Sequence, residues 1–178
     1  LCDCNKINDL KLNNLKSKKI DIIFIAVGGG GLISGIGAYV KTVNPKIKIV
    51  AVEAADAAGL NSSLKANRRI KLKEVGLFAD GAAAKQIGKH NYKLIKEWID
   101  DSITVSTDEI CAAVKDTFID TRTIPEPTGA LALAGLKKYV INKKIKNKNL
   151  IIIFVSFKYL GPSPRCIFKV YNLYSTIT

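Results

Sequence analysis

The sequence predicts an α/β fold with three layers, in which a parallel sheet is covered by helices on both faces. Short apolar, β-rich runs alternate with segments of helical periodicity along most of the chain. One run, residues 21–27, is apolar throughout after its first residue, which is typical of a strand buried on both faces. The 178 residues suffice for one domain or the larger part of one, since domains span roughly 100 to 200 residues.

Turn residues and helix caps set the expected boundaries. Glycines at 28–31 end the first strand, and an Asn-Pro pair at 44–45 ends the helix that follows. Ser106 or Thr107 can cap a later helix, and the charge of Glu109 favours the same helix start. The other expected elements are, in chain order, a helix over 32–43, a strand over 48–53, helices near 56–66 and 92–100, a strand over 102–105, helices over 107–120 and 128–140, and a strand over 150–155.

The charge is concentrated in the two ends of the chain. There are 28 basic and 15 acidic residues, a net charge of +13. Residues 1–20 carry +3, residues 21–136 carry +1 and residues 137–178 carry +9. We therefore predict a solvated lysine-rich helix end and loop at 137–148 rather than a basic groove, and expect no nucleic acid among the partners. A nucleic-acid binder that works through the basic tail stays an alternative, which steep salt dependence would support.

The cysteines and the apolar runs indicate a protein of a reducing compartment that does not cross a membrane. The four cysteines lack C-x-x-C spacing and His90 is the single histidine, so neither a zinc site nor disulfides are predicted for Cys2, Cys4, Cys111 and Cys166. The longest apolar runs, 22–27 and 150–155, are far shorter than the roughly 20 residues that span a bilayer. We expect a cytoplasmic or organellar protein with no membrane partner.

The candidate site is the glycine loop between the first strand and the first helix. Gly28, Gly29, Gly30 and Gly31 let the backbone approach a ligand closely, and the helix start at Leu32 presents unpaired N–H groups. Such a loop is typical of a phosphate cradle, although a tight turn for close strand–helix packing would need one or two of these glycines.

The residues of the loop leave the identity of the phosphate ligand open at this point. A dinucleotide-binding loop needs G-x-G-x-x-G or A and an acidic residue about 20 positions later. Residues 29–34 nearly match, with Ser34 in the last position, and Glu53 closes the second strand. A nucleoside-triphosphate loop is excluded, because no Lys-Ser or Lys-Thr follows the glycines.

Several stretches together resemble the threonine deaminase branch of the fold-type II pyridoxal-phosphate enzymes, whose domains are similar to the tryptophan synthase β subunit. They are the glycine loop at 23–33, Val-Gly-Leu-Phe-Ala-Asp-Gly at 75–81, residues 100–116, and Glu-Pro-Thr-Gly-Ala-Leu-Ala-Leu-Ala-Gly at 126–135. The resemblance implies that residues 1–178 form a single, partial catalytic domain. Its family-like core spans about 20–140, and its ends at 1–19 and 155–178 diverge.

The resemblance implies a lyase that uses pyridoxal 5'-phosphate. Its substrate is threonine, or serine in the related dehydratases and racemases, and threonine yields 2-oxobutanoate and ammonia for isoleucine biosynthesis. By the family pattern, Gly28 to Gly31 and Leu32 grip the cofactor phosphate, and Glu126 lies near the cofactor ring. Stabilisation of a helix start is the other interpretation of Glu126. The parent enzyme is expected to be a homo-oligomer.

The chain also departs from the family pattern. In the family, the Schiff-base lysine lies in a Ser-x-Lys motif well upstream of the glycine loop, and no lysine of this chain has a comparable position. We therefore assign no catalytic residue and expect a fragment. The family follows its last strand with Ser-Gly-Ala-Asn, whereas residues 154–158 read Phe-Val-Ser-Phe-Lys, with Ser156 as a displaced remnant. The racemase metal site matches Glu53 and Ala57 but has Gly59 at its third position, so no metal is predicted.

Overall fold

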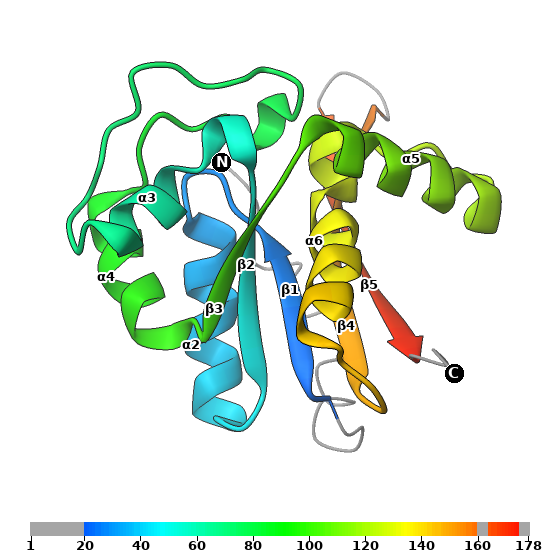
Figure 1. Cartoon of the computed structure of the whole chain (residues 1–178), viewed down its shortest axis with the longest axis horizontal. Coiled ribbons are helices and arrows are strands. Elements are labelled where there is room, and N and C mark those ends of the chain that lie inside the picture. The colour runs from blue at the N-terminus through cyan, green and yellow to red at the C-terminus, as the bar shows by residue number, and fades with distance from the viewer. Residues whose placement is uncertain (1–19, 160–163, 175–178) are drawn as a thin grey trace.

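The computed structural model describes residues 20–159 and 164–174, and its five strands form one sheet in the order β3-β2-β1-β4-β5. β1, β2, β3 and β4 run parallel, and helices lie on both faces of the sheet (Figure 1). The three-layer α/β prediction is therefore confirmed. The elements are β1 (Ile22–Ala26), α2 (Gly31–Val43), β2 (Lys48–Ala54), η2 (Ala55–Ala57), α3 (Gly59–Lys65), η3 (Asp80–Ala82), α4 (Lys89–Trp98), β3 (Asp101–Val105), α5 (Thr107–Thr121), α6 (Pro127–Lys143), β4 (Asn149–Tyr159) and β5 (Pro164–Tyr174).

The central strands bury both of their faces in two separate cores. On β1, Phe24 packs in the core that α6 covers, whereas Ile23 and Ile25 pack in the core that α2 and α4 cover. These three side chains are at most 2% exposed. The continuous apolar run at 21–27 thus belongs to a strand covered on both sides, as the sequence predicted.

β5 is an element that the sequence analysis missed. It pairs antiparallel with β4, from Asn149 opposite Tyr174 to Tyr159 opposite Pro164. β4 consequently extends beyond the expected end at residue 155 and lies inside the sheet rather than at its edge. Because residues 155–178 diverge from the family pattern, no strand is assigned to them from the sequence.

Local boundaries differ from expectation in several places, including the end of α6, which is at Lys143 rather than at residue 140. The helix expected near 56–66 is a single 3-10 turn followed by α3, and α4 begins at Lys89 rather than at Tyr92. The predicted cap of α5 is confirmed as a capping box: the Ser106 hydroxyl accepts the Glu109 N–H, and the Glu109 carboxylate accepts the Ser106 N–H.

α6 lies unusually close to the sheet at Gly135. A Cβ atom at this position would be 2.4 Å from Cγ2 of Val52, which is on β2. Phe24 of β1 and Tyr139 of α6 also meet edge to face, with their ring centroids 5.4 Å apart. The missing side chain of Gly135 therefore sets the distance between α6 and the strands below it.

Glu53 at the end of β2 is buried and caps α3. Its carboxylate oxygens accept the N–H groups of Leu60 and Asn61, each at 2.7 Å. The side chain is 1% exposed. Burial raises the pKa of Glu53 to about 7, while the two N–H bonds act in the opposite direction.

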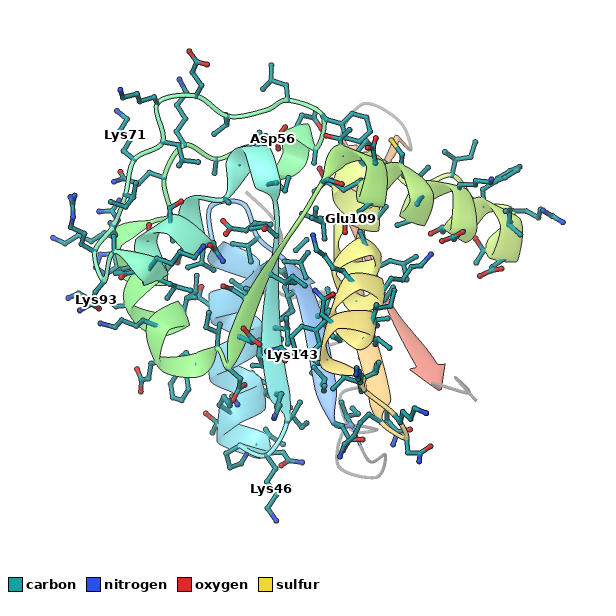
Figure 2. All side chains as sticks on the ribbon, viewed as in Figure 1. Lys46, Asp56, Lys71, Lys93, Glu109 and Lys143 are labelled. Atoms are coloured by element: carbon teal, nitrogen blue, oxygen red, sulfur yellow. The ribbon has the colours of Figure 1, made fainter. Side chains whose placement is uncertain are left out.

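The lysine run at 137–148 contacts acidic side chains of other elements. Lys138 and Glu109 are 2.9 Å apart, and Figure 2 shows Lys143 beside the strands, where it is 3.6 Å from Asp101. The other two pairs are Lys137 with Asp116 and Lys148 with Asp21. These pairs are partly exposed and contribute little stability each, but they neutralise part of the basic end.

The near-neutral total of the core hides a separation of charge. Residues 65–96 contain nine lysines and arginines but only Glu74 and Asp80 as acids, a net charge of +7. Lys71, in the loop after α3, and Lys93, in α4, extend into solvent (Figure 2). In residues 20–159 and 164–174, no helix is long and apolar enough to cross a membrane.

We expect Gly135→Ala to destabilise the protein by about 1–3 kcal/mol, because the new methyl group overlaps Val52. Gly35→Ala, on the exposed face of α2, is the matched control and should stabilise by about 0.5–1 kcal/mol, since a Cβ there meets nothing within 4 Å. Urea unfolding measures both, and combination with Val52→Ala should restore part of the loss. Equal stability of the two glycine variants would contradict the close contact.

The stability of the protein should fall as the pH rises from about 4.5 to 7. The folded state keeps the Glu53 proton up to about pH 7, whereas the unfolded state releases it near the ordinary value of 4.5. The folded state binds more protons in this window, so about 2–3 kcal/mol is lost across it. Unfolding of Glu53→Gln should lack this pH-dependent loss, and exposed Glu74→Gln should retain it. Identical pH profiles for wild type and Glu53→Gln would refute the assignment.

Candidate functional site

The glycine loop begins where β1 leaves the sheet. The Val27 N–H still donates to the Val52 carbonyl at 2.9 Å, and the chain then turns through Gly28 and Gly29 into α2. Gly30, which precedes the helix, has a φ of 87°. A Cβ atom at Gly30 would also lie 2.8 Å from Ile95 Cδ1, so the packing as well as the positive φ favours glycine there.

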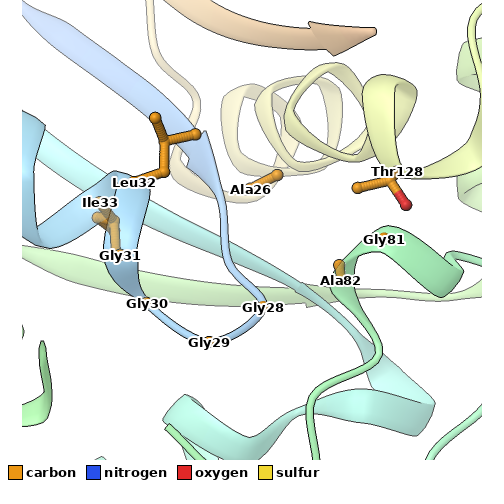
Figure 3. A pocket seen from close by; sticks show the side chains of 10 residues that line it. All are labelled: Ala26, Gly28, Gly29, Gly30, Gly31, Leu32, Ile33, Gly81, Ala82 and Thr128. Carbon is orange, nitrogen blue, oxygen red and sulfur yellow. The ribbon is translucent and has the colours of Figure 1, made fainter. Parts of the chain in front are cut away.

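A cavity of about 200 Å³ opens on the side of this loop that faces away from α4. Figure 3 shows the loop on one side and η3 with the start of α6 on the other. The lining residues are Ala26, Gly28, Gly29, Gly30, Gly31, Leu32, Ile33, Gly81, Ala82 and Thr128. All five predicted loop residues, Gly28 to Gly31 and Leu32, therefore line one cavity.

The loop presents backbone groups rather than charged side chains to this cavity. None of the described residues that line it is ionisable. The Ser34 N–H is bonded to the Gly30 carbonyl, whereas the amides of Gly31, Leu32 and Ile33 are those that a helix start leaves without a partner in the helix. These groups and the positive helix end fit an anion.

Two of the glycines leave room for a ligand. A Cβ atom at Gly29 or Gly31 would meet no atom of the described residues within 4 Å. At Gly28, by contrast, a Cβ would lie 3.0 Å from Cα of Ala82, so this glycine allows the loop and η3 to pack together. The open glycines and the uncharged amide lining fit a group of the size and charge of a phosphate.

Glu126 lies at the start of α6, two residues from the cavity wall. It is the N-cap residue, but its carboxylate makes no capping hydrogen bond. Its Oε1 is buried without a hydrogen-bond partner among the described residues. Burial, and then the negative charge of Asp80, raise the pKa of Glu126. The structure places Glu126 beside the cavity rather than in its lining.

The opposite wall contains residues to which the sequence analysis assigned no role. Gly81 and Ala82 come from η3, and Thr128 comes from the first turn of α6. The Thr128 side chain is 6% exposed, and its Oγ1 has no hydrogen-bond partner in the described part of the chain. Both segments were recognised as family-like stretches, but their meeting with the glycine loop depends on the tertiary fold.

Other sequence predictions have different outcomes. Cys111 is a free, exposed thiol, whereas Cys2 and Cys4 lie outside the described residues. Cys166 and Ser156 are in described strands, but their side chains are not described. Glu53, the acidic residue that a dinucleotide site would need, is bonded to the start of α3 instead and is closed off from solvent.

Comparison with known proteins agrees with this geometry. A family model described as "Pyridoxal-phosphate dependent enzyme" matches residues 9–156. The mitochondrial threonine dehydratase of Schizosaccharomyces pombe is 52% identical over 138 residues, which are 78% of this chain and 23% of that protein. The biosynthetic L-threonine dehydratase of Escherichia coli is 49% identical over 131 residues, 74% of this chain and 26% of that protein.

Solved structures give the same result. The processed form of threonine deaminase isoform 2 from Solanum lycopersicum superposes with a TM-score of 0.78 and 40% identity, over 81% of this chain and 42% of that chain. Serine racemase from Dictyostelium discoideum has a TM-score of 0.70 and 31% identity, over 88% of this chain and 49% of that one.

The chain spans about a quarter of the length of the curated threonine dehydratases that it matches. The family match, however, covers most of the chain, including the glycine loop, η3 and the cavity between them. The resemblance inferred from the glycine loop and the downstream stretches is thereby confirmed, and the chain belongs to the family of pyridoxal-phosphate dependent enzymes.

Proposed function

We propose that the chain forms the phosphate-binding part of a pyridoxal-phosphate dependent threonine ammonia-lyase, which converts threonine to 2-oxobutanoate and ammonia. The observation that carries this proposal is the cavity between the glycine loop and η3, lined by amide groups and by no ionisable side chain among the described residues. The threonine dehydratases and the threonine deaminase that the chain resembles support the choice of reaction.

The residues of the chain have separate tasks in this proposal. The amides of Gly31, Leu32 and Ile33 bind the cofactor phosphate, and the N-terminal end of α2 stabilises its charge. Ala26 and Leu32 give the cavity an apolar wall that limits water around these hydrogen bonds. The bound cofactor supplies the electron sink for loss of the α-proton and the β-hydroxyl group.

Glu126 is proposed to face a polar group at the ring side of the cofactor. Its Oε1 is buried without a hydrogen-bond partner among the described residues, which leaves this oxygen available for a hydrogen bond with a polar group of the cofactor. Ser-x-Lys triplets occur at 17–19, 63–65 and 156–158, but none of them lies well upstream of the glycine loop as in the family pattern. The covalent anchor of the cofactor is therefore not assigned to any residue of this chain.

Substrate choice, assembly and location follow from the relatives only as proposals. We propose threonine rather than serine as the preferred substrate, because the relatives that are about 50% identical are named threonine dehydratases. The proposed location is the cytoplasm or an organelle, since several relatives are named mitochondrial or chloroplastic. A homo-oligomer is proposed on the family resemblance alone. No nucleic-acid or membrane partner is proposed.

We expect Gly31→Val to weaken binding of pyridoxal phosphate at least tenfold, because the added side chain occupies space beside the helix-start amides. Fluorescence titration of the chain with pyridoxal phosphate measures the dissociation constant. Gly35→Ala, one turn later on the same helix, is the control and should bind like wild type. Unchanged affinity in Gly31→Val, with an unchanged melting temperature, would place the ligand elsewhere.

The assignment to this cofactor is tested against the dinucleotide alternative. We expect saturable binding of pyridoxal phosphate and none of NAD, because Glu53 is bonded within the fold and cannot accept a ribose hydroxyl. Calorimetric titration with both compounds decides between them. Saturable NAD binding in the absence of pyridoxal-phosphate binding would reverse the proposal.

The reaction itself requires a second measurement. Release of 2-oxobutanoate from threonine is assayed with this chain and with the product of the whole reading frame that encodes it. We expect turnover only where a lysine can bind the cofactor covalently, and borohydride should therefore fix no cofactor to this chain alone. Turnover by this chain with specific labelling of one of its own lysines would contradict that expectation.

A further inference from the structure

The conformation of the glycine loop is fixed from outside the cavity by the start of α4. The Gly29 carbonyl accepts two hydrogen bonds from this region, one from Asn91 Nδ2 at 2.9 Å and one from the Gly88 N–H at 3.2 Å. Asn91 belongs to the first turn of α4, 62 residues after Gly29 in the sequence. A residue remote in the sequence thus holds one particular carbonyl group of the loop.

The orientation of the Asn91 amide group is determined by its surroundings. Its Oδ1 lies 3.3 Å from the Ser34 hydroxyl, which is also 3.0 Å from the Gly31 carbonyl. If the amide group were turned over, Oδ1 would face the Gly29 carbonyl and two acceptors would be opposed. Asn91 therefore donates to the loop through Nδ2 and faces α2 with its oxygen.

This contact also determines the direction of the next N–H group. In a planar trans peptide the carbonyl and the following N–H point to opposite sides. Because the Gly29 carbonyl is directed at α4, the Gly30 N–H is directed away from α4. The cavity lies on that side, since the residues that line it come from the loop, α2, η3, β1 and α6 and none comes from α4.

We propose that Asn91 is a positioning residue for the bound phosphate, acting by holding the Gly29 carbonyl so that the Gly30 N–H is aimed into the cavity. The inference rests on the proposed binding of pyridoxal phosphate and adds to it a residue outside the cavity. Ile87 and Ile95 contribute packing under Gly30, but Asn91 supplies the one side-chain hydrogen bond to the Gly29 carbonyl in the described part of the chain.

The ratio of the affinities for pyridoxal phosphate and pyridoxal tests the proposal, because the two compounds differ only in the phosphate. We expect Asn91→Ala to weaken pyridoxal-phosphate binding about tenfold, equivalent to about 1.4 kcal/mol, and to change pyridoxal binding less than about twofold. Asn91→Asp keeps the size of the side chain but loses the hydrogen-bond donor and adds a negative charge, so it should weaken pyridoxal-phosphate binding at least as much. Asn91→Asp also serves if Asn91→Ala does not fold.

Tyr92→Phe is the matched control on the same helix turn. It removes the hydrogen bond from the Tyr92 hydroxyl to the Ser63 carbonyl, which ties α4 to α3 without touching the loop. We expect a lower melting temperature and an unchanged affinity ratio. If Tyr92→Phe lowers the ratio as much as Asn91→Ala, the effect comes from loosening α4 and the positioning role is wrong.

The Gly30 amide gives a second readout that does not depend on catalysis. Inorganic phosphate should shift the amide proton resonance of Gly30 downfield in wild type, and this shift should be largely lost in Asn91→Ala. A preference for pyridoxal phosphate in wild type that is fully retained in both Asn91 variants would overturn the positioning role and leave the proposed function intact. A wild-type chain with no preference for the phosphorylated compound would overturn both.

Discussion

The position of β1 between β2 and β4 is the constraint on which the rest of the structure depends. β1 is paired in parallel with both neighbours, and its side chains enter two separate cores. A strand held on both edges and both faces has a fixed end point. The glycines that follow Val27 therefore leave the sheet at a defined position, where the last bond to β2 is made by the Val27 N–H.

The same arrangement explains why a cavity lies at this point. From β1 the chain crosses to β2 on one side, whereas β4 is added on the other side of β1. The connection from β1 to β2 and the connection that leads into β4 lie on opposite faces of the sheet, so the carboxyl end of β1 is left open between them. α2 covers one face and α6 the other, so the starts of two helices from different layers face the same space.

The sequence was sufficient for those parts of the molecule that local chemistry determines. Apolar runs predicted the buried strands, the Ser106 and Glu109 pair predicted a helix start, and the glycines predicted the loop. β5 was missed because its residues pair with β4 through contacts that no local pattern specifies. Thr128 and Asn91 could not be assigned for the same reason, since their proximity to the loop comes from the packing of α6 and α4.

Local information was also insufficient for charged residues. Glu53 occupied the position of a ligand-binding acid in the sequence, yet the fold buries it against the start of α3. The net charge of the core was close to zero, yet its cations gather between residues 65 and 96. The spacing of Glu53 from the glycine loop and the net charge of the core follow directly from the sequence. Whether these charged groups can meet a ligand depends on where the fold places them.

The close approach at Gly135 makes the site sensitive to a change at a distance. α6 contacts β2 at Gly135, and the first turn of the same helix places Thr128 in the lining of the cavity. Any side chain at residue 135 would push α6 away from β2 and would thereby displace the N-terminal end of the helix at the cavity. Variation that spares every cavity residue could therefore still alter ligand binding, and a search for inactivating substitutions should include the underside of this helix.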